Sequence, residues 1–527
     1  MNIDLSLENA GRGVLESGVT TFAQVFARGE LSGGSGLVAN LGGRTSAVQL
    51  DVKTTYDDGS VKMAVLSLLR PDLAAGQSVD VALSTAAASA VPAIDLARAI
   101  GSHSFEIDIV GQGGKHEVDV LGALREALAN GTASTWQNGA LASQARVEVP
   151  LDGSQRLVFD VTVYAGGGMK VDAQFNNDGA MGADGGRVSY HVTATMDGEV
   201  VMRQSVNQDQ YQNWHESFST TDHDGGQGLG SPAKGWLNIG HDAAHLENTG
   251  AIADYNLSIG VSEARLSAWG AAAQSNGFGD PLSANDLVQY MPTTGGRDDI
   301  GFTTAANTAW LMTQDPRAAA YALGQAEAAS AIPWHLWDSA NDEWLSADAY
   351  PHLWTDGRGG TGTPGNANSG GLTQQIGTGS GWTLDSAHQP DVSYVPYLLT
   401  GERWMLDSLQ ARLPGTSSTP GPTRVAQKAR WWSMVARCGT PPGHCDRSTR
   451  RPGPARTAAR KSRISPRRPR RTGPGWWSRS PPGPQRRARS MAGCRATTAP
   501  SVRCRPGSRT TSPPPPSPLH RRATRMR

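Results

Sequence analysis

Cysteine is absent from residues 1–414, because all four cysteines of the 527-residue chain lie at Cys438 or beyond. Disulfide bonds therefore cannot stabilise this part of the chain, which we call the body. No run of roughly eighteen or more apolar residues occurs, so a membrane-spanning helix is not expected. The N-terminal residues also lack the basic and apolar segments of a signal peptide, so we expect no signal peptide.

Basic residues are scarce in the body and abundant after it. The chain has 48 lysines and arginines and 47 acidic residues, but 27 of the basic residues and only one acidic residue, Asp446, lie from Gly415 onward. The body thus holds 21 basic and 46 acidic side chains, a net charge of about −25 with neutral histidines. This excess of negative charge repels polyanions at long range unless a local basic pocket overrides the repulsion.

The basic segment, residues 415–527, contains almost no large apolar side chains. Only five of its 113 residues are Leu, Ile, Val or Phe, so it cannot bury enough apolar surface to offset the entropy of ordering its backbone. We therefore predict a disordered tail. Such a tail is often an arm that binds nucleic acid, but arginine, proline, glycine, serine and cysteine are also what a GC-rich gene encodes when it is read out of frame.

We favour out-of-frame translation for this tail over a nucleic-acid arm. Codons permitted for residues 434–452 can encode an amphipathic helix pattern when the reading frame is displaced by two nucleotides. The frame would then slip near 412–425 and cut a longer protein short. We accordingly expect no nucleic acid as a partner and no zinc site at Cys438, His444 and Cys445, because no second ligand pair has the usual spacing.

Alternating apolar and polar residues dominate residues 1–230 and predict β-strands. Such segments flank the Asp-Gly pairs at 58–59, 152–153 and 197–198, and an Asp-Gly pair in this position indicates a hairpin. One helix is expected at 116–131, ending at a glycine. Many short strands joined by turns are typical of a barrel or a sandwich, and the pattern does not distinguish the two.

The spacing of apolar residues becomes helical after position 283. Helices are predicted at 283–291, 303–314, 315–331 and 390–413, with Asp315 as an N-cap before a first-turn proline. Consecutive helices with short connections indicate an α/α hairpin array such as a toroid.

The predicted fold is multidomain, β followed by α. A β-rich barrel or sandwich region occupies 1–230, and a connecting segment occupies 231–282. A truncated α/α-toroid-like helical domain then occupies 283–414, and the tail follows at 415–527.

Tryptophan, histidine and aspartate are enriched together in the irregular stretch 331–388 and near it. This combination suits a saccharide, because indole rings cover the apolar faces of sugar rings while carboxylates, amides and imidazoles bind hydroxyl groups. The same residues also have structural interpretations, since tryptophans pack in cores and aspartates cap helices. The predicted substrate-binding residues are Trp334, Asp338, His352, Trp354, Arg358, Trp382, Asp385 and Gln389.

Two parts of the body resemble a known family. The stretch DDGSVKMAVLSLLRPDLAAGQSVDVALS is similar to the RIFT-related barrel of exo-rhamnogalacturonan-lyase-like bacterial proteins. The segments GGRDDIGFTTAANTAWLMTQDPRAA, IPWHLWD, YPHLWTD and GWTLDSAHQPDVSYVPYLLTGE resemble the helical-toroid part of bacterial and prophage proteins that carry this barrel. The resemblance covers most of 1–412. It implies a carbohydrate-active protein with a polysaccharide or oligosaccharide as its partner and with closing helices missing beyond 412. Because no signal peptide or membrane span is expected, we predict a cytoplasmic or phage-associated location.

A polysaccharide lyase is the activity that we predict. It needs a cation to neutralise the uronate carboxylate and a base to remove the neighbouring proton. Arg297 is the first candidate for the cation and Arg358 the second. His335 or His388 would be the base, and Tyr394 would protonate the leaving oxygen.

Two other functions remain open. A glycoside hydrolase would use two carboxylates on either side of the scissile bond, chosen from Asp299, Asp338 and Asp385. A non-catalytic phage tail or surface protein would bind glycans without cleaving them. No metal or other cofactor is expected for any of these functions.

Overall fold

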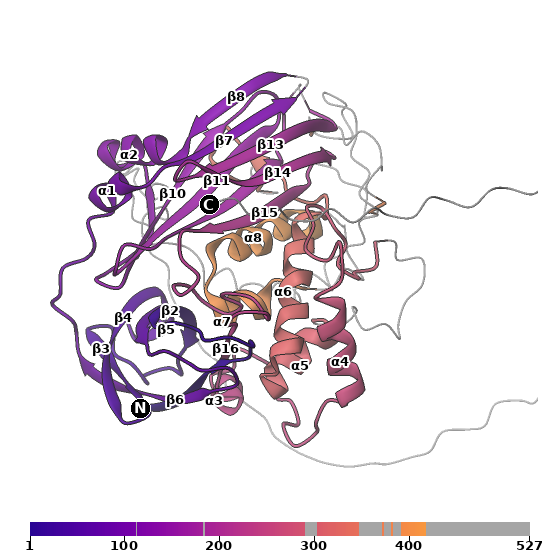
Figure 1. The fold of residues 1–527 in the computed structure, drawn as a ribbon. Coiled ribbons are helices and arrows are strands. Elements are labelled where there is room, and N and C mark those ends of the chain that lie inside the picture. The colour runs from indigo at the N-terminus through magenta and orange to yellow at the C-terminus, as the bar shows by residue number, and fades with distance from the viewer. Residues whose placement is uncertain are drawn as a thin grey trace, which may run out of the picture. The chain divides into compact units, whose positions relative to one another are not determined.

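The computed structural model describes residues 1–111, 113–182, 185–289, 303–346, 372–373, 381–382 and 391–417 (Figure 1). After Ala411 it describes the backbone alone. From position 418 onward the predicted tail lies outside the described residues. All described residues fall in one of the two units of the chain, Met1–Arg450.

Seven antiparallel strands form a nearly closed, barrel-like sheet (Figure 1). Its strand order is β16-β1-β6-β3-β4-β5-β2. The segment 225–229 bridges the two ends of this order, because Gly225 exchanges backbone hydrogen bonds with β2 and residues 228 and 229 bond with Leu237 of β16. The strands are β1 (Asn2–Asn9), β2 (Gly18–Val25), β3 (Ser35–Leu41), β4 (Arg44–Thr55), β5 (Val61–Arg70), β6 (Ser78–Ala87) and β16 (Leu237–Gly240).

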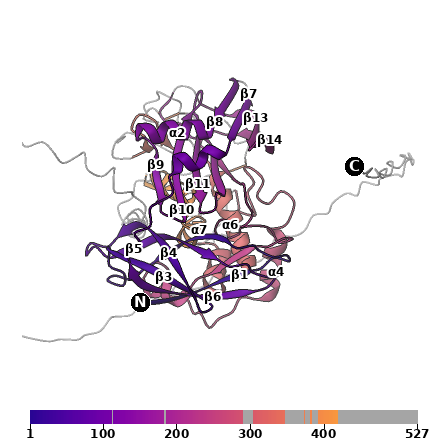
Figure 2. The ribbon, with the colours of Figure 1, turned by 60° about the vertical axis from the view of Figure 1, so that its left-hand side comes forward.

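A five-stranded and a four-stranded antiparallel sheet pack face to face as a sandwich (Figure 2). One apolar cluster joins them, and in it the rings of Phe105 and Phe159 lie 6.4 Å apart. The body therefore contains both a barrel and a sandwich. The five-stranded sheet runs β15 (Asn213–Ser219), β12 (Met169–Asn177), β11 (Gln155–Tyr164), β10 (Ala142–Pro150), β9 (Ser134–Asn138). The four-stranded sheet runs β14 (Glu199–Gln208), β13 (Val188–Met196), β7 (Phe105–Gly111), β8 (Gly114–Asp119).

All three predicted hairpins are confirmed. They join β4 to β5, β10 to β11 and β13 to β14, each pair antiparallel. The glycines at 59, 153 and 198 have φ of 82°, 68° and 83°, which a side chain would disfavour. In the third turn Asp197 also has a positive φ of 50°, as a two-residue type I′ turn requires.

The helix predicted at 116–131 is confirmed only from Val120 onward. Residues 116–119 belong to β8, because they pair with β7. Helix α2 (Val120–Asn130) begins after Asp119, whose carboxylate accepts a hydrogen bond from the backbone N–H of Gly122 at 2.8 Å. It ends at Gly131, which has a φ of 69°. Strand pairing thus overrode the helical pattern at its start.

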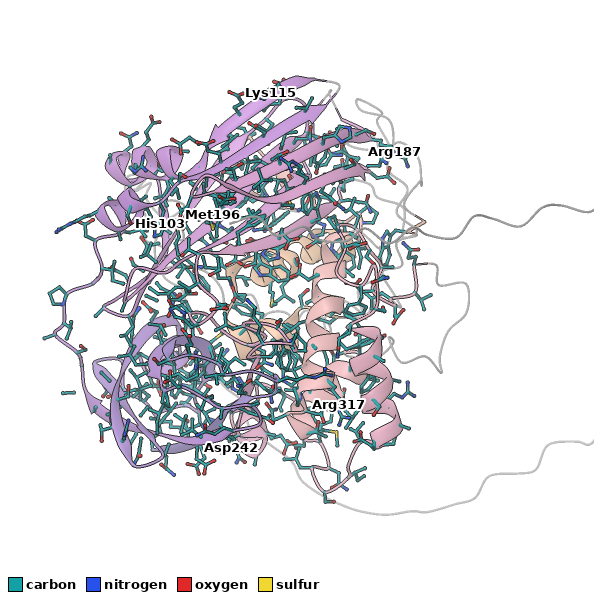
Figure 3. The ribbon with its side chains drawn as sticks, viewed as in Figure 1. His103, Lys115, Arg187, Met196, Asp242 and Arg317 are labelled. Carbon is teal, nitrogen blue, oxygen red and sulfur yellow. The ribbon has the colours of Figure 1, made fainter. Side chains whose placement is uncertain are left out.

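Most helices other than α2 come later in the sequence than β16, the last strand of the barrel-like sheet. Residues 231–282, expected only to connect two domains, contain β16 and two helices. Arg317 joins two of the helices, because its guanidinium pairs with Glu263 at 2.5 Å (Figure 3). The remaining elements are α1 (Leu96–Ala99), the 3₁₀ turn η1 (Ile100–Ser102), α3 (Ala243–Asn248), α4 (Glu263–Ala272), α5 (Ala305–Thr313), α6 (Pro316–Ser330), β17 (Trp337–Asp338), β18 (Glu343–Trp344), α7 (Tyr394–Thr400) and α8 (Arg403–Ser417).

The predicted helices at 303–314 and 315–331 are confirmed as α5 and α6, and Asp315 caps α6. The prediction at 283–291 is wrong over its described part, 283–289, which forms turns. There Asn285 has a φ of 43°, and its amide bonds with the backbone of Gly279 and Gly324. Tertiary hydrogen bonds therefore replaced the local helix.

The helix predicted at 390–413 is divided into α7 and α8 at Gly401, which has a φ of 73°. A Cβ atom at this position would lie 2.7 Å from Val65 of β5, so only glycine lets the helix pair approach the barrel this closely. Among the helices of the described residues, none is long and apolar enough to span a membrane.

Candidate functional site

One face of the five-stranded sheet carries charged and amide side chains that are nearly all buried. In β11 the alternation of side chains sends Leu157, Phe159 and Val161 into the sandwich core, and Arg156 and Asp160 to the opposite face. Side chains from α6, α8 and β17 contact this opposite face. We call it the polar face, and it comprises Gln144, Arg146, Glu148, Arg156, Asp160, Thr162, Lys170, Asp172, Gln174, Asn176, Asn213 and His215.

Arg146 lies between two carboxylates of the polar face and helix α8. Its guanidinium donates to Asp160 at 2.9 and 2.6 Å and to Asp407 at 3.0 and 2.6 Å. Gln174 donates a further hydrogen bond to Asp407 at 2.7 Å. Burial alone would lower the pKa of Arg146, but the two carboxylates raise it well above its usual value. The group stays charged and ties α8 to the sheet.

His215 is the centre of a second buried group of charges. Its Nδ1 lies 3.1 Å from both carboxylate oxygens of Glu327 on α6, and its Nε2 lies 3.3 Å from Asp172 on β12. Lys170 pairs with Asp172 at 3.1 Å and with Glu402 at 2.9 Å. Because both ring nitrogens face carboxylates, both must donate, and the ring is an imidazolium.

The charge of His215 follows from a balance of two effects. Burial alone would lower its pKa, but the carboxylates of Glu327 and Asp172 outweigh burial and raise the pKa to about 10. The ring also stacks on Trp404 of α8, with centroids 4.1 Å apart and planes 14° apart. The imidazolium therefore joins the sheet to both α6 and α8.

The free energy of unfolding is expected to fall as the pH rises from about 6.5 toward about 10, the ordinary and the folded-state pKa of His215. In this window the folded protein holds a proton that the unfolded chain has released, so each rise in pH favours unfolding. Urea unfolding across this range measures the slope. His215→Gln should flatten it, and an unchanged slope in that variant would show that other groups cause it.

His335 is buried beside two tryptophans in the segment that precedes and includes β17 and β18. Its ring centroid lies 6.4 Å from that of Trp334 and 6.1 Å from that of Trp344. Its Nδ1 lies 3.0 Å from the carbonyl oxygen of Ile332 and 3.3 Å from that of Tyr211. Since carbonyls only accept, Nδ1 carries the proton and Nε2 presents a lone pair.

The Nε2 atom of His335 has no hydrogen-bond partner among the described residues. Burial lowers the pKa of His335 to about 4, so the ring is neutral at neutral pH. The backbone that holds it is strained, because Tyr211 has a positive φ of 70°. A neutral imidazole with a bare nitrogen can accept a proton or a hydrogen bond.

Arg156 supplies a cation next to this histidine. It donates to Asp178 at 3.0 Å with two nitrogens and to Glu148 at 2.5 Å. Its guanidinium lies 3.8 Å from the ring centroid of Trp337 and 5.6 Å from that of Trp344. Trp344 therefore contacts both Arg156 and His335, which places a cation, a neutral base and indole rings in one site.

Five of the residues predicted from the sequence lie in the described part of the chain. Trp334 and Trp382 are brought together in one apolar cluster, and His335 adjoins it. Asp338 is buried and accepts hydrogen bonds from the backbone of Ala340 at 3.1 Å and the amide of Asn341 at 2.6 Å, as a turn aspartate does.

Tyr394 packs in a separate apolar cluster among the helices, where its hydroxyl donates to the carbonyl of Ala251 at 2.6 Å. The structure does not group it with His335. The other predicted residues lie outside the described residues: Arg297, Asp299, His352, Trp354, Arg358, Asp385, His388 and Gln389.

The residues that the sheet contributes to this site were not among those predicted from the sequence. Arg156 and Asp172 were passed over, because strand residues that alternate with apolar ones are usually solvent-exposed. One signal was present: consecutive strands carry charges of both signs two or four residues apart, and therefore on one face, as in RVEVP, RLVFDVTV and KVDAQF. Charges of both signs in register on neighbouring strands favour a paired, buried face.

Comparison with known proteins found no matching family model and no matching curated protein. Within the described ranges, no group of three or more His, Cys, Asp or Glu side chains is arranged to hold a metal ion.

Proposed function

We propose that this protein is carbohydrate-active and of the polysaccharide-lyase type, cleaving a uronate-containing glycan by β-elimination. The observation that supports this most directly is His335, a buried neutral imidazole whose Nδ1–H is held by two carbonyls and whose Nε2 is bare. A cation, Arg156, and the indole rings of Trp337 and Trp344 lie next to it. These are the groups that an elimination on a sugar acid requires.

The proposed reaction uses His335 first as base and then as acid. Nε2 takes the proton on the carbon next to the uronate carboxylate, and the electron pair of that C–H bond becomes the new carbon–carbon double bond. The bond to the glycosidic oxygen breaks, and the imidazolium returns the proton to this oxygen. A uronate bound nearby would raise the low pKa of the imidazole and make it a better base.

Arg156 is the proposed partner of the uronate carboxylate. It already pairs with Asp178 and Glu148, whose side chains are 0% and 33% exposed. The substrate carboxylate would take the place of Glu148, the more exposed of the two. A negative charge would thus be exchanged rather than added, which avoids an unpaired buried charge.

The proposal includes the fold that the sequence resemblance implies. The barrel would be a RIFT-related barrel, and α5 to α8 would belong to an α/α toroid. Two features support this. The seven-stranded sheet is nearly closed, and the pairs α5–α6 and α7–α8 are each joined by two residues.

The proposal is tested by incubating the full chain with pectic and bacterial uronate polysaccharides. We expect ultraviolet absorbance from unsaturated uronides to rise together with new reducing ends. A neutral galactan is the control and should give neither signal, because it has no carboxylate to acidify the C–H bond. Reducing ends without absorbance would indicate hydrolysis, and binding without either would indicate a glycan-binding protein, so both results would contradict elimination.

A further inference from the structure

A second feature of the polar face is a set of buried hydrogen-bond acceptors without donors. Asn176 on β12 and Asn213 on β15 lie directly opposite each other on neighbouring antiparallel strands, so their side chains share one face of the sheet. The two residues are 2% and 3% exposed. The Oδ1 atoms of both have no hydrogen-bond partner among the described residues.

His335 belongs to the same neighbourhood. Its backbone N–H and its Nδ1 both face the carbonyl of Tyr211, at 3.2 and 3.3 Å, two residues before Asn213 in the chain. Asn176 also lies opposite Arg156 on the neighbouring strand β11. Trp344 contacts both Arg156 and His335. The bare Nε2 of His335 is thus a third acceptor without a partner among the described residues, and it shares neighbours with the two asparagines.

The orientation of Asn213 is set by its surroundings. Its Nδ2 lies 3.3 Å from a carboxylate oxygen of Asp178, so exchanging the amide oxygen and nitrogen would place two acceptors against each other. The hydrogen bonds of Arg156 go to Asp178 and Glu148, and none reaches the amide oxygens of Asn176 and Asn213. Buried acceptors without donors cost stability, and most proteins avoid them.

We propose that Asn176 and Asn213, next to the base His335, form a binding subsite that accepts hydrogen bonds from the hydroxyl groups of a sugar. Three acceptors repel an anionic group, and the neighbouring charge of Arg156 repels an ammonium group. The group that fits these acceptors is therefore an uncharged hydrogen-bond donor, such as a sugar hydroxyl. The indoles of Trp337 and Trp344 would cover the apolar face of the same ring. The inference rests on the proposed function for the class of ligand, but not for the reaction.

The test uses Asn176→Leu, which keeps the size of the side chain and removes its acceptor. Ligand-observed NMR with D-galacturonate and with L-rhamnose measures the binding of each sugar to the full chain. We expect the affinity for at least one sugar to fall ten-fold or more. The melting temperature should stay unchanged or rise by about 2 °C, because an unpaired buried acceptor has been removed.

Asn307→Leu is the matched control. Asn307 is a buried asparagine of α5 whose Oδ1 also lacks a partner among the described residues. The same substitution there should leave sugar binding unchanged.

Three outcomes would overturn the inference: no binding of either sugar by the unaltered chain, an unchanged affinity in Asn176→Leu, or a lowered melting temperature. The last would show that Asn176 holds a structural water. Binding that depends on Asn176 without any elimination would support the subsite and contradict the lyase. Elimination that is unaffected by Asn176→Leu would support the lyase and contradict the subsite.

Discussion

Asp407→Ala is expected to lower the free energy of unfolding by about 3–5 kcal/mol, because it removes one partner of a buried ion pair. Asp407 accepts two hydrogen bonds from Arg146 and one from Gln174. After the substitution the guanidinium stays buried with fewer acceptors, and the amide of Gln174 loses its partner. Burial alone would raise the pKa of Asp407, but Arg146 lowers it, so the carboxylate is charged in the folded protein. Urea unfolding followed by circular dichroism measures the loss.

Two variants sharpen this experiment. Asp57→Ala removes an ion pair with Arg28 in which both side chains are more than half exposed, and we expect no measurable change. Replacing Arg146 by Met together with both of its carboxylate partners, Asp160 and Asp407, by Leu should recover much of the lost stability, because apolar side chains of similar size can replace a buried ion-pair group. A loss as small in Asp407→Ala as in Asp57→Ala would show that the pair does not hold α8 on the sheet.

His335→Asn is expected to reduce the rate of elimination by about 10²–10⁴-fold with little change in stability. The amide nitrogen of asparagine can occupy the place of Nδ1 and keep the hydrogen bonds to the carbonyls of Ile332 and Tyr211. The substitution removes only the nitrogen that would take the proton. Initial rates of uronide absorbance measure the effect, and the melting temperature shows whether the fold is kept.

His241→Asn is the control for this prediction. His241 is also buried, burial lowers its pKa to about 4, and its Nδ1 has no partner among the described residues. It packs against Phe22 of the barrel with ring centroids 6.0 Å apart. Its substitution should leave the rate unchanged. Equal losses in the two variants would show that a buried histidine matters only for stability, and His335 would not be the base.

The hairpins and the capped helix α6 could be predicted because their signals are local. An Asp-Gly pair between alternating segments sets the turn by its own backbone preference, and Asp315 caps the helix that begins at the next residue. The prediction was wrong where distant groups competed. Residues 116–119 pair with β7, and Asn285 bonds with Gly279 and Gly324, so sheet and tertiary hydrogen bonds outweighed the helical pattern.

The residues of the candidate site also fall into those that the sequence predicted and those that it did not. Trp334, His335, Asp338 and Trp382 stood out because rare side chains gathered in one stretch of sequence. The sheet residues did not, because alternation shows that two faces differ but not what covers either of them. Arg156 pairs with Asp178 and stacks on Trp337, far apart in the chain from one another, and no local pattern links them.

Local chemistry in the chain was thus enough to establish the three Asp-Gly hairpins, the capped start of α6 and the acidic, cysteine-free character of the body. The tertiary structure alone decided that the charged side of the five-stranded sheet is buried and which charges are paired there. The reason is physical. A turn or a cap is set by neighbours along the chain, whereas the state of a buried charge depends on partners that only folding brings within hydrogen-bond distance.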